Sequence, residues 1–178
     1  MTAVMTLALS AFAAIFLGLL IAMRRPDRFR VTRTAVIKAP AARVFALIND
    51  LKTFNTWSRC LHRDAGVHGL YSGPAGGVGA ACTWQIRQTG SASLTITRSE
   101  APVGLAMTLA VTPASPAHHG ADFTLWAEGD NLTIVTWVVH GPAPYLARVK
   151  GLFVDTDRAI GNGVEADLAN LKRLAHGR

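Results

Sequence analysis

Histidine and aspartate side chains are the residues of this sequence that could perform acid/base chemistry. General acid/base catalysis needs two titratable groups that converge in a cleft poor in water, and the spacing along the chain shows no such pair. His140 ends a predicted strand beside the start of the C-terminal helix, so it is the best acid/base candidate. The full set is His62, His68, His118, His119, His140 and His176, with Asp64, Asp122, Asp155 and Asp157.

Ordinary structural roles, such as surface positions and helix caps, account for most of these residues. His118 and His119 fall in a predicted turn, where a solvated surface position is expected. Asp155 and Asp157 suit helix capping and surface charge where the last helix restarts, although Asp155 would lie near the mouth of a cavity. We therefore assign no catalytic residue.

Nucleophilic and metal chemistry find no support in the motifs. Cys60 and Cys82 lie in apolar contexts that raise the pKa of a thiol, and no G-x-S-x-G motif occurs. The cysteines lack the CxxC or Cys/His spacing of a metal site. The glycine-rich stretch 73–79 lacks the Lys and Ser/Thr of a phosphate loop. We expect free, buried thiols, no metal and no cofactor.

An uncharged apolar run opens the chain. Residues 4–22 supply 19 largely apolar positions. At about 1.5 Å rise each they would extend ~28 Å as a helix, close to the ~30 Å thickness of the hydrocarbon core. A cleaved signal peptide would need a basic start and a small-x-small cleavage site, and this run has neither. We expect residues 1–23 to be a transmembrane anchor.

Basic residues follow the run immediately. Five arginines at 24, 25, 28, 30 and 33 against Asp27 give +4 of the formal +7 of the chain. Such residues stay on the cytoplasmic side, which predicts a single-pass membrane protein with its domain facing the cytoplasm. They either contact anionic head groups, at about 1 kcal/mol each, or only set topology. The remainder carries little net charge, so no nucleic-acid partner is expected. Nothing in the sequence sets an oligomeric state.

The rest of the chain predicts an α+β domain. Residues 24–30 form a basic linker, and the domain covers residues 31–178. Alternation predicts a strand at 29–37 and five more at 80–88, 91–99, 105–112, 121–127 and 132–140, with turns at 89–90, 100–104, 113–120 and 128–131. A helix at 41–48 and a second short turn through Phe54 follow the first strand, and a strand near 69–71 interrupts a glycine-rich loop. Helical spacing covers 145–175, with a break near Asp155.

Several motifs occur in an order that one known family shows. They are TRTAVIKAP at 32–40, VFALIND at 44–50, Trp57-Ser58, YSGP at 71–74, GVG at 77–79, VTW at 135–137, GLF at 151–153 and LANLK at 168–172. This succession resembles START-like polyketide cyclase/dehydrase proteins, the SRPBCC superfamily. The resemblance implies a helix-grip fold, in which a curved antiparallel sheet wraps a long C-terminal helix and leaves a cavity. Members carry lipids, sterols, hormones or polyketides, and a minority are enzymes. The N-terminal span is not part of the general family pattern.

Large apolar side chains could line that cavity, although ordinary core packing is the more common role for any single one of them. We expect a membrane-tethered binding domain for a small hydrophobic ligand, either a lipid or a polyketide-like molecule. Two alternatives stay open: a cyclase/dehydratase enzyme that uses the same cavity, and a non-catalytic partner-binding domain whose cavity is filled. Trp126 has the opposite strand parity and should face outward. The candidate ligand contacts are Trp57, Trp84, Met107, Phe123, Trp137, Leu152 and Phe153.

Overall fold

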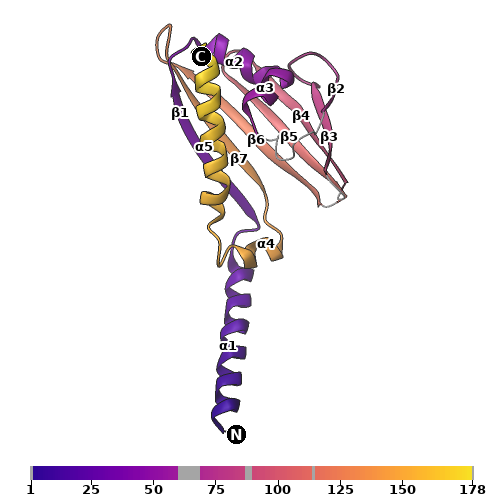
Figure 1. The fold of residues 1–178 in the computed structure, drawn as a ribbon, viewed down its shortest axis with the longest axis vertical. Helices are drawn as coiled ribbons and strands as arrows, with labels where there is room; N and C mark the ends of the chain where they lie inside the picture. Colours follow the sequence, from indigo (N-terminus) through magenta and orange to yellow (C-terminus); the bar gives the residue numbers. More distant parts are fainter. Residues whose placement is uncertain (1, 60–68, 87–89, 114, 178) are drawn as a thin grey trace.

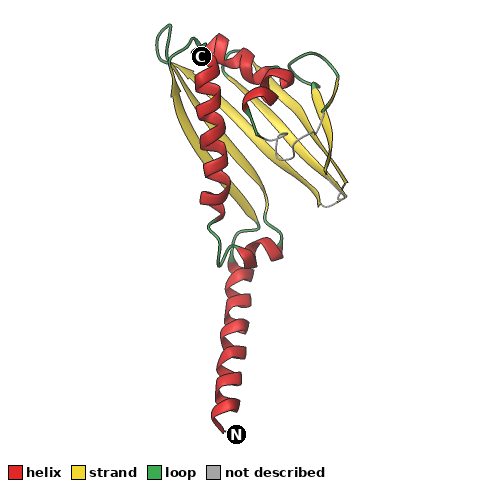
Figure 2. Cartoon of the chain, viewed as in Figure 1, coloured by secondary structure: helices red, strands yellow, loops and turns green. Residues whose placement is uncertain are grey.

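The computed structural model describes residues 2–59, 69–86, 90–113 and 115–177. One curved sheet of seven antiparallel strands carries helices on one face (Figure 1 and Figure 2). Its order is β1-β7-β6-β5-β4-β3-β2, so that β1 and β7 pair although they lie far apart in sequence. The strands are β1 (Arg28–Ile37), β2 (Leu70–Ser72), β3 (Ala81–Ile86), β4 (Gly90–Glu100), β5 (Gly104–Pro113), β6 (Ser115–Ala127) and β7 (Thr133–Pro142).

The predicted apolar face of the sheet is confirmed. Register places Leu105 of β5 opposite Phe123 of β6, and Phe123 opposite Trp137 of β7, so three large side chains form one row across the sheet. All three are buried in one hydrophobic core. Successive side chains of a strand point to opposite faces, so this row lies on the same face as the other alternate apolar residues. Trp126 has the opposite parity and is exposed, as expected.

Two short helices follow β1, and a broken helix ends the chain. Asp50 separates α2 (Ala41–Asn49) from α3 (Leu51–Trp57), and its side chain accepts a hydrogen bond from the Lys52 N–H. The C-terminal helical pattern divides into α4 (Tyr145–Lys150) and α5 (Thr156–Ala175). Asp155 caps α5 by accepting from the Arg158 N–H, so the predicted break at Asp155 is confirmed and its capping role is the observed one.

Ion pairs hold α5 on the sheet. Arg33 on β1 contacts Asp157 at 2.8 Å and Glu165 at 2.6 Å. These carboxylates raise the pKa of Arg33, and Arg33 in turn lowers the pKa of Asp157. Among the five arginines of the basic cluster, Arg33 therefore binds α5. Gly161 makes room for it, because a Cβ there would lie 1.8 Å from the Arg33 Nη2.

A second polar connection joins the end of α3 to α5. The buried Asp167 carboxylate accepts from the Ser58 hydroxyl at 3.4 Å and from the Arg59 Nε at 3.0 Å. Asn170 donates to the Trp57 carbonyl at 2.9 Å. The Trp57-Ser58 motif thus fixes α3 against the C-terminal helix.

The predicted turn at 113–120 is wrong for its described residues. Residues 115–120 belong to β6, and they pair with β5 through Val111↔Ser115 and Leu109↔His119 across a register shift. Pairing of β6 with β7 begins only at Gly120. Proline has no N–H to donate, and the strand tolerates Pro116 because this residue is not among those of β6 that pair with β5 or β7. Residue 114 lies outside the described residues.

The chain begins with α1 (Thr2–Arg24), which projects away from the sheet (Figure 1). Residues 25–27 alone separate it from β1, and α4 packs against its C-terminal end. Within the part of the chain that the structure describes, no helix has both the length and the apolar character needed to cross a membrane. The expected transmembrane helix is therefore not found there.

Candidate ligand-binding interior

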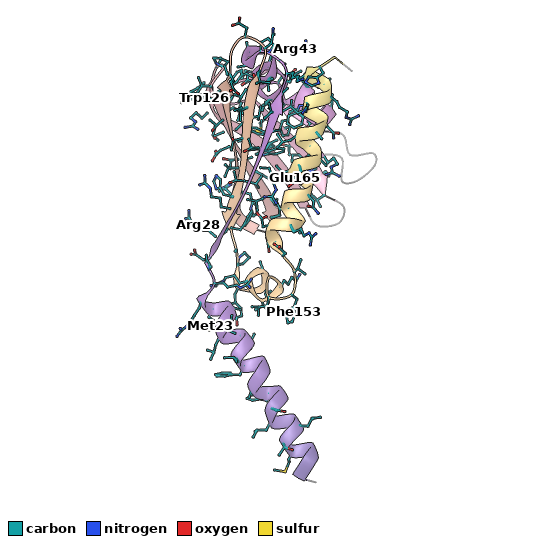
Figure 3. All side chains as sticks on the ribbon, turned by 90° about the vertical axis from the view of Figure 1, so that its left-hand side faces the viewer. Met23, Arg28, Arg43, Trp126, Phe153 and Glu165 are labelled. Carbon is teal, nitrogen blue, oxygen red and sulfur yellow. The ribbon has the colours of Figure 1, made fainter. Side chains whose placement is uncertain are left out.

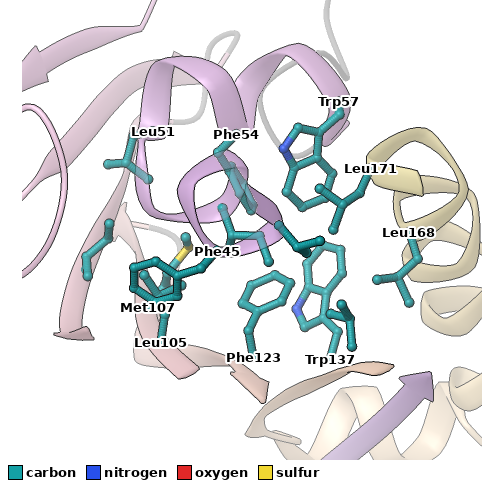
Figure 4. Packing of buried hydrophobic residues seen from close by; sticks show 14 of the residues in the cluster. Phe45, Leu51, Phe54, Trp57, Leu105, Met107, Phe123, Trp137, Leu168 and Leu171 are labelled. Atoms are coloured by element: carbon teal, nitrogen blue, oxygen red, sulfur yellow. The ribbon is translucent and has the colours of Figure 1, made fainter. Parts of the chain in front are cut away.

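An aromatic layer lies between the sheet and the helices. Trp57 of α3 packs edge-on against Phe54 at 4.7 Å between ring centroids, and against Trp137 at 6.0 Å. Phe123 lies 4.6 Å from Trp137, with the two rings tilted by 31°. Edge and tilted contacts at these distances are the favourable arrangements for aromatic pairs. We call Phe54, Trp57, Phe123 and Trp137 the aromatic layer (Figure 4).

The rest of the interior is aliphatic. Leu168 and Leu171 of α5 point toward the aromatic layer, and Met107 and Leu105 of β5 lie beside it (Figure 4). Trp84 belongs to the same buried cluster. The structure therefore brings five of the predicted contacts, Trp57, Trp84, Met107, Phe123 and Trp137, into one interior.

The other two predicted contacts lie elsewhere. Leu152 and Phe153 fall between α4 and α5, and Phe153 is 85% exposed. Figure 3 places Phe153 near Met23 at the end of α1, at the opposite end of the domain from Trp126. Both residues are therefore outside the buried cluster.

The two indole N–H groups of the aromatic layer differ in their partners. Trp57 Nε1 donates to the Leu47 carbonyl at 3.0 Å. Trp137 is 6% exposed, and its Nε1 is buried without a hydrogen-bond partner among the described residues. An unpaired buried donor costs about 1–3 kcal/mol relative to a paired one. The Trp137 N–H is therefore a polar group available inside an apolar environment.

Two surface pockets lie away from the aromatic layer. An open groove of about 940 Å³ is lined by Lys38, Arg43, Glu128, Lys172 and His176 among others. A pocket of about 270 Å³ lies beside Tyr71 and the 72–75 turn. No residue of the aromatic layer lines either pocket. The layer is packed by its own side chains, and an open cavity between the sheet and α5 is not shown.

A histidine and an aspartate do form a pair that the sequence spacing did not reveal. His140 Nε2 lies 3.0 Å from Asp122 Oδ2, because β6 and β7 are adjacent. Strand alternation places His140 on the face of β7 opposite Trp137. The pair therefore lies on the outer face of the sheet and cannot act on a ligand held among the aromatic residues.

The remaining candidates offer no acid/base site in the described part of the chain. His119 lies on β6, 5.8 Å from the Phe29 ring, and burial lowers its pKa. Asp155 is a helix cap, and the His176 Nε2 accepts from the Lys38 N–H. His62, Asp64 and His68 lie outside the described residues. No group of three or more His, Cys, Asp and Glu residues among those described could hold a metal ion.

Cys82 is a free thiol in the buried core, as expected. Burial raises its pKa, and hydrogen bonds with Asn55 and Tyr71 partly oppose this rise. The raised pKa leaves little reactive thiolate near neutral pH. Cys60 lies outside the described residues.

Solved structures show the same fold at low sequence identity. Norcoclaurine synthase from Thalictrum flavum, in complex with dopamine and hydroxybenzaldehyde, matches with a TM-score of 0.61 and 9% identity over 85% of this chain and 88% of that chain. Protein CV1439 from Chromobacterium violaceum matches at 0.58 and 16% over 85% and 98%. Protein Ms6760 from Mycobacterium smegmatis matches at 0.52 and 17% over 83% and 91%. These likenesses establish the fold alone.

The family is shown by sequence. A comparison with curated proteins finds no match. Residues 28–176, which contain the whole sheet and helices α2 to α5, match the model for polyketide cyclase / dehydrase and lipid transport proteins. The chain therefore belongs to the polyketide cyclase / dehydrase and lipid transport family.

Proposed function

We propose that the protein is a membrane-tethered binding domain for a small hydrophobic ligand, lipid or polyketide-like, held between the sheet and α5. One observation carries the proposal: the buried Trp137 Nε1 has no partner among the described residues, and apolar rings surround it. Native proteins leave few buried donors unpaired. A ligand with an acceptor oxygen on an apolar skeleton would pair this N–H and match its surroundings.

Binding requires the interior to open. The aromatic layer is closely packed, so a ligand must separate α5 from the sheet or displace rings. The segment before α5 and the first turn of α5 have little buried surface, since residues 153–159 are all exposed. Local opening begins where few buried contacts must be broken, and this end of α5 meets that condition.

The tether is proposed from α1. Its described side chains include Leu7, Phe12 and Leu17, and all three are exposed apolar residues. A soluble protein rarely leaves large apolar side chains in water all along a helix, whereas lipid would cover them. The arginines that follow α1 favour a cytoplasmic position for the domain.

The test is mass spectrometry of organic extracts from the full-length protein, purified from membranes in mild detergent. We expect a species of defined mass that is enriched over an α1-only control. Trp137→Phe removes the donor and should reduce this species. Trp126→Phe makes the same substitution at an exposed site and should retain it. Absence of any enriched species from the wild-type protein would refute the binding function.

The packed interior favours one alternative, a partner-binding domain with a filled cavity. Neither pocket reaches the aromatic layer, which is what this alternative requires. It predicts no extracted species. It also predicts that the full-length protein has the same thermal unfolding midpoint with and without added lipid extract.

A further inference from the structure

A second apolar surface lies beside the end of α1. It consists of α4 and the four residues that follow it, Tyr145–Val154, and we call this segment the platform. Leu146 is 74% exposed and Phe153 is 85% exposed, and Val154 is also exposed. Apolar side chains that gather on one surface mark contact with a partner or a membrane.

Hydrogen bonds fasten the platform to α1. Arg25 Nη1 donates to the Gly151 carbonyl at 2.6 Å. Arg148 Nη1 donates to the carbonyls of Met23 and Arg25 at 3.3 and 3.2 Å. Tyr145 donates from its hydroxyl to the Leu19 carbonyl at 3.2 Å. The bond to Met23 satisfies one of the carbonyls at the helix end that lack intrahelical partners, and the four bonds together hold the platform next to the end of α1.

Exposed basic residues lie on the platform and on the chain where α1 leads into β1. Arg24, Arg28 and Lys150 are exposed, and the ion pairs found among the described residues include none of them. Asp155 and Asp157 follow the platform in the chain, Asp157 is paired with Arg33, and Asp27 lies in the connection between α1 and β1. Exposed apolar side chains next to basic ones are typical of segments that lie in the interface of an anionic membrane.

We propose that the platform docks on the surface of an anionic phospholipid bilayer, with Phe153 and Leu146 entering the boundary between head groups and acyl chains. The inference rests on the proposed membrane tether, because α1 brings the platform to the bilayer. Charge complementarity with acidic head groups and continuity with the apolar α1 favour an anionic bilayer as the partner of this surface. Since Val154 leads directly into the cap of α5, docking also holds the first turn of α5 at the membrane.

The experiment uses the full-length protein reconstituted into vesicles of phosphatidylcholine, with or without phosphatidylglycerol. Phe153→Cys is labelled with the environment-sensitive fluorophore NBD, and Trp126→Cys is the matched control at the far end of the domain (Figure 3). Both side chains are largely exposed, so neither change removes core packing. Labelling of the wild-type protein measures the background from Cys60 and Cys82.

We expect the emission of the label at position 153 to shift to shorter wavelength, and doxyl-labelled lipids to quench it severalfold more strongly than the label at position 126. Phosphatidylglycerol should strengthen this quenching, and Lys150→Glu should weaken it. If the protein floats with the vesicles while both labels remain equally water-exposed, the platform proposal is overturned and the tether stands. Equal quenching at position 153 with and without phosphatidylglycerol overturns the anionic specificity. Failure to float overturns the tether and the platform together.

Discussion

Two tryptophans of the aromatic layer give a matched test of the unpaired donor. Trp57→Phe and Trp137→Phe remove the same atoms from buried indoles in the same cluster. Both variants lose similar packing, so the cost of the smaller ring largely cancels in the difference. What remains is the difference between a paired N–H and an unpaired one.

The magnitude follows from the hydrogen bonds. Trp57→Phe loses the bond to the Leu47 carbonyl, which contributes about 0.5–1.5 kcal/mol. Trp137→Phe removes a buried donor whose missing partner costs about 1–3 kcal/mol. In ligand-free protein we therefore expect Trp57→Phe to be the less stable variant by roughly 1.5–4.5 kcal/mol.

The assay is urea unfolding of the full-length protein in detergent, followed by far-ultraviolet circular dichroism because tryptophan fluorescence changes in both variants. Equal m-values are needed, since an altered m-value would signal a changed unfolded or native state. Equal free energies of unfolding for the two variants would refute the argument, because they would mean that the Trp137 N–H is satisfied without a ligand. Saturation with the extracted ligand should raise the free energy of unfolding of the wild-type protein, and it should raise that of Trp137→Phe by less.

Three further predictions concern the attachment of α5. Gly163→Ala should stabilise the domain by up to ~1 kcal/mol of helix propensity, because nothing lies within 4 Å of the added Cβ. Gly161→Ala should gain less or lose stability, because its Cβ would displace Arg33; equal gains in thermal denaturation would contradict this packing. The pKa of Asp157 is lowered in the folded state, so its contribution to folding stability is complete above the ordinary carboxyl pKa of about 4 and is lost as pH falls below that value. Asp157→Asn should therefore reduce the loss of stability at acid pH. An unchanged acid loss would exclude this ion pair as its source. Asp167→Ala removes a buried acceptor of hydrogen bonds and should cost about 1–3 kcal/mol in urea unfolding, whereas a loss within error would show that the connection contributes nothing.

Local alternation explains why the apolar face of the sheet could be predicted. Side chains alternate between the two faces along each strand, so the sequence of one strand is enough to assign its apolar residues to a common face. This holds for Phe123 with Leu125 and for Val135 with Trp137. The break before α5 is similarly local, since Asp155 is a strong capping residue. These features need no tertiary information.

Pairing between strands explains what was missed. Prolines and a glycine between 113 and 120 are turn signals, yet β5 supplies partners that keep residues 115–120 extended. The pair of His140 with Asp122 joins residues 18 apart, and only the register of β6 against β7 brings them together. Register depends on the whole sheet, so sequence spacing could not show it.

The prediction that Phe153 lines the interior assumes that one uninterrupted helix runs through it. Counted as one helix, residues 149–171 put Val149, Leu152 and Phe153 on the same stripe as Leu168 and Leu171. The cap at Asp155 ends that count, because a new helix starts with its own orientation. Phe153 is then released from the core and remains exposed, whereas Val149 and Leu152 are half-buried outside the core. An apolar stripe that is interrupted by a helix break can therefore leave part of its side chains at the surface, as with Phe153, which we propose to enter the bilayer boundary.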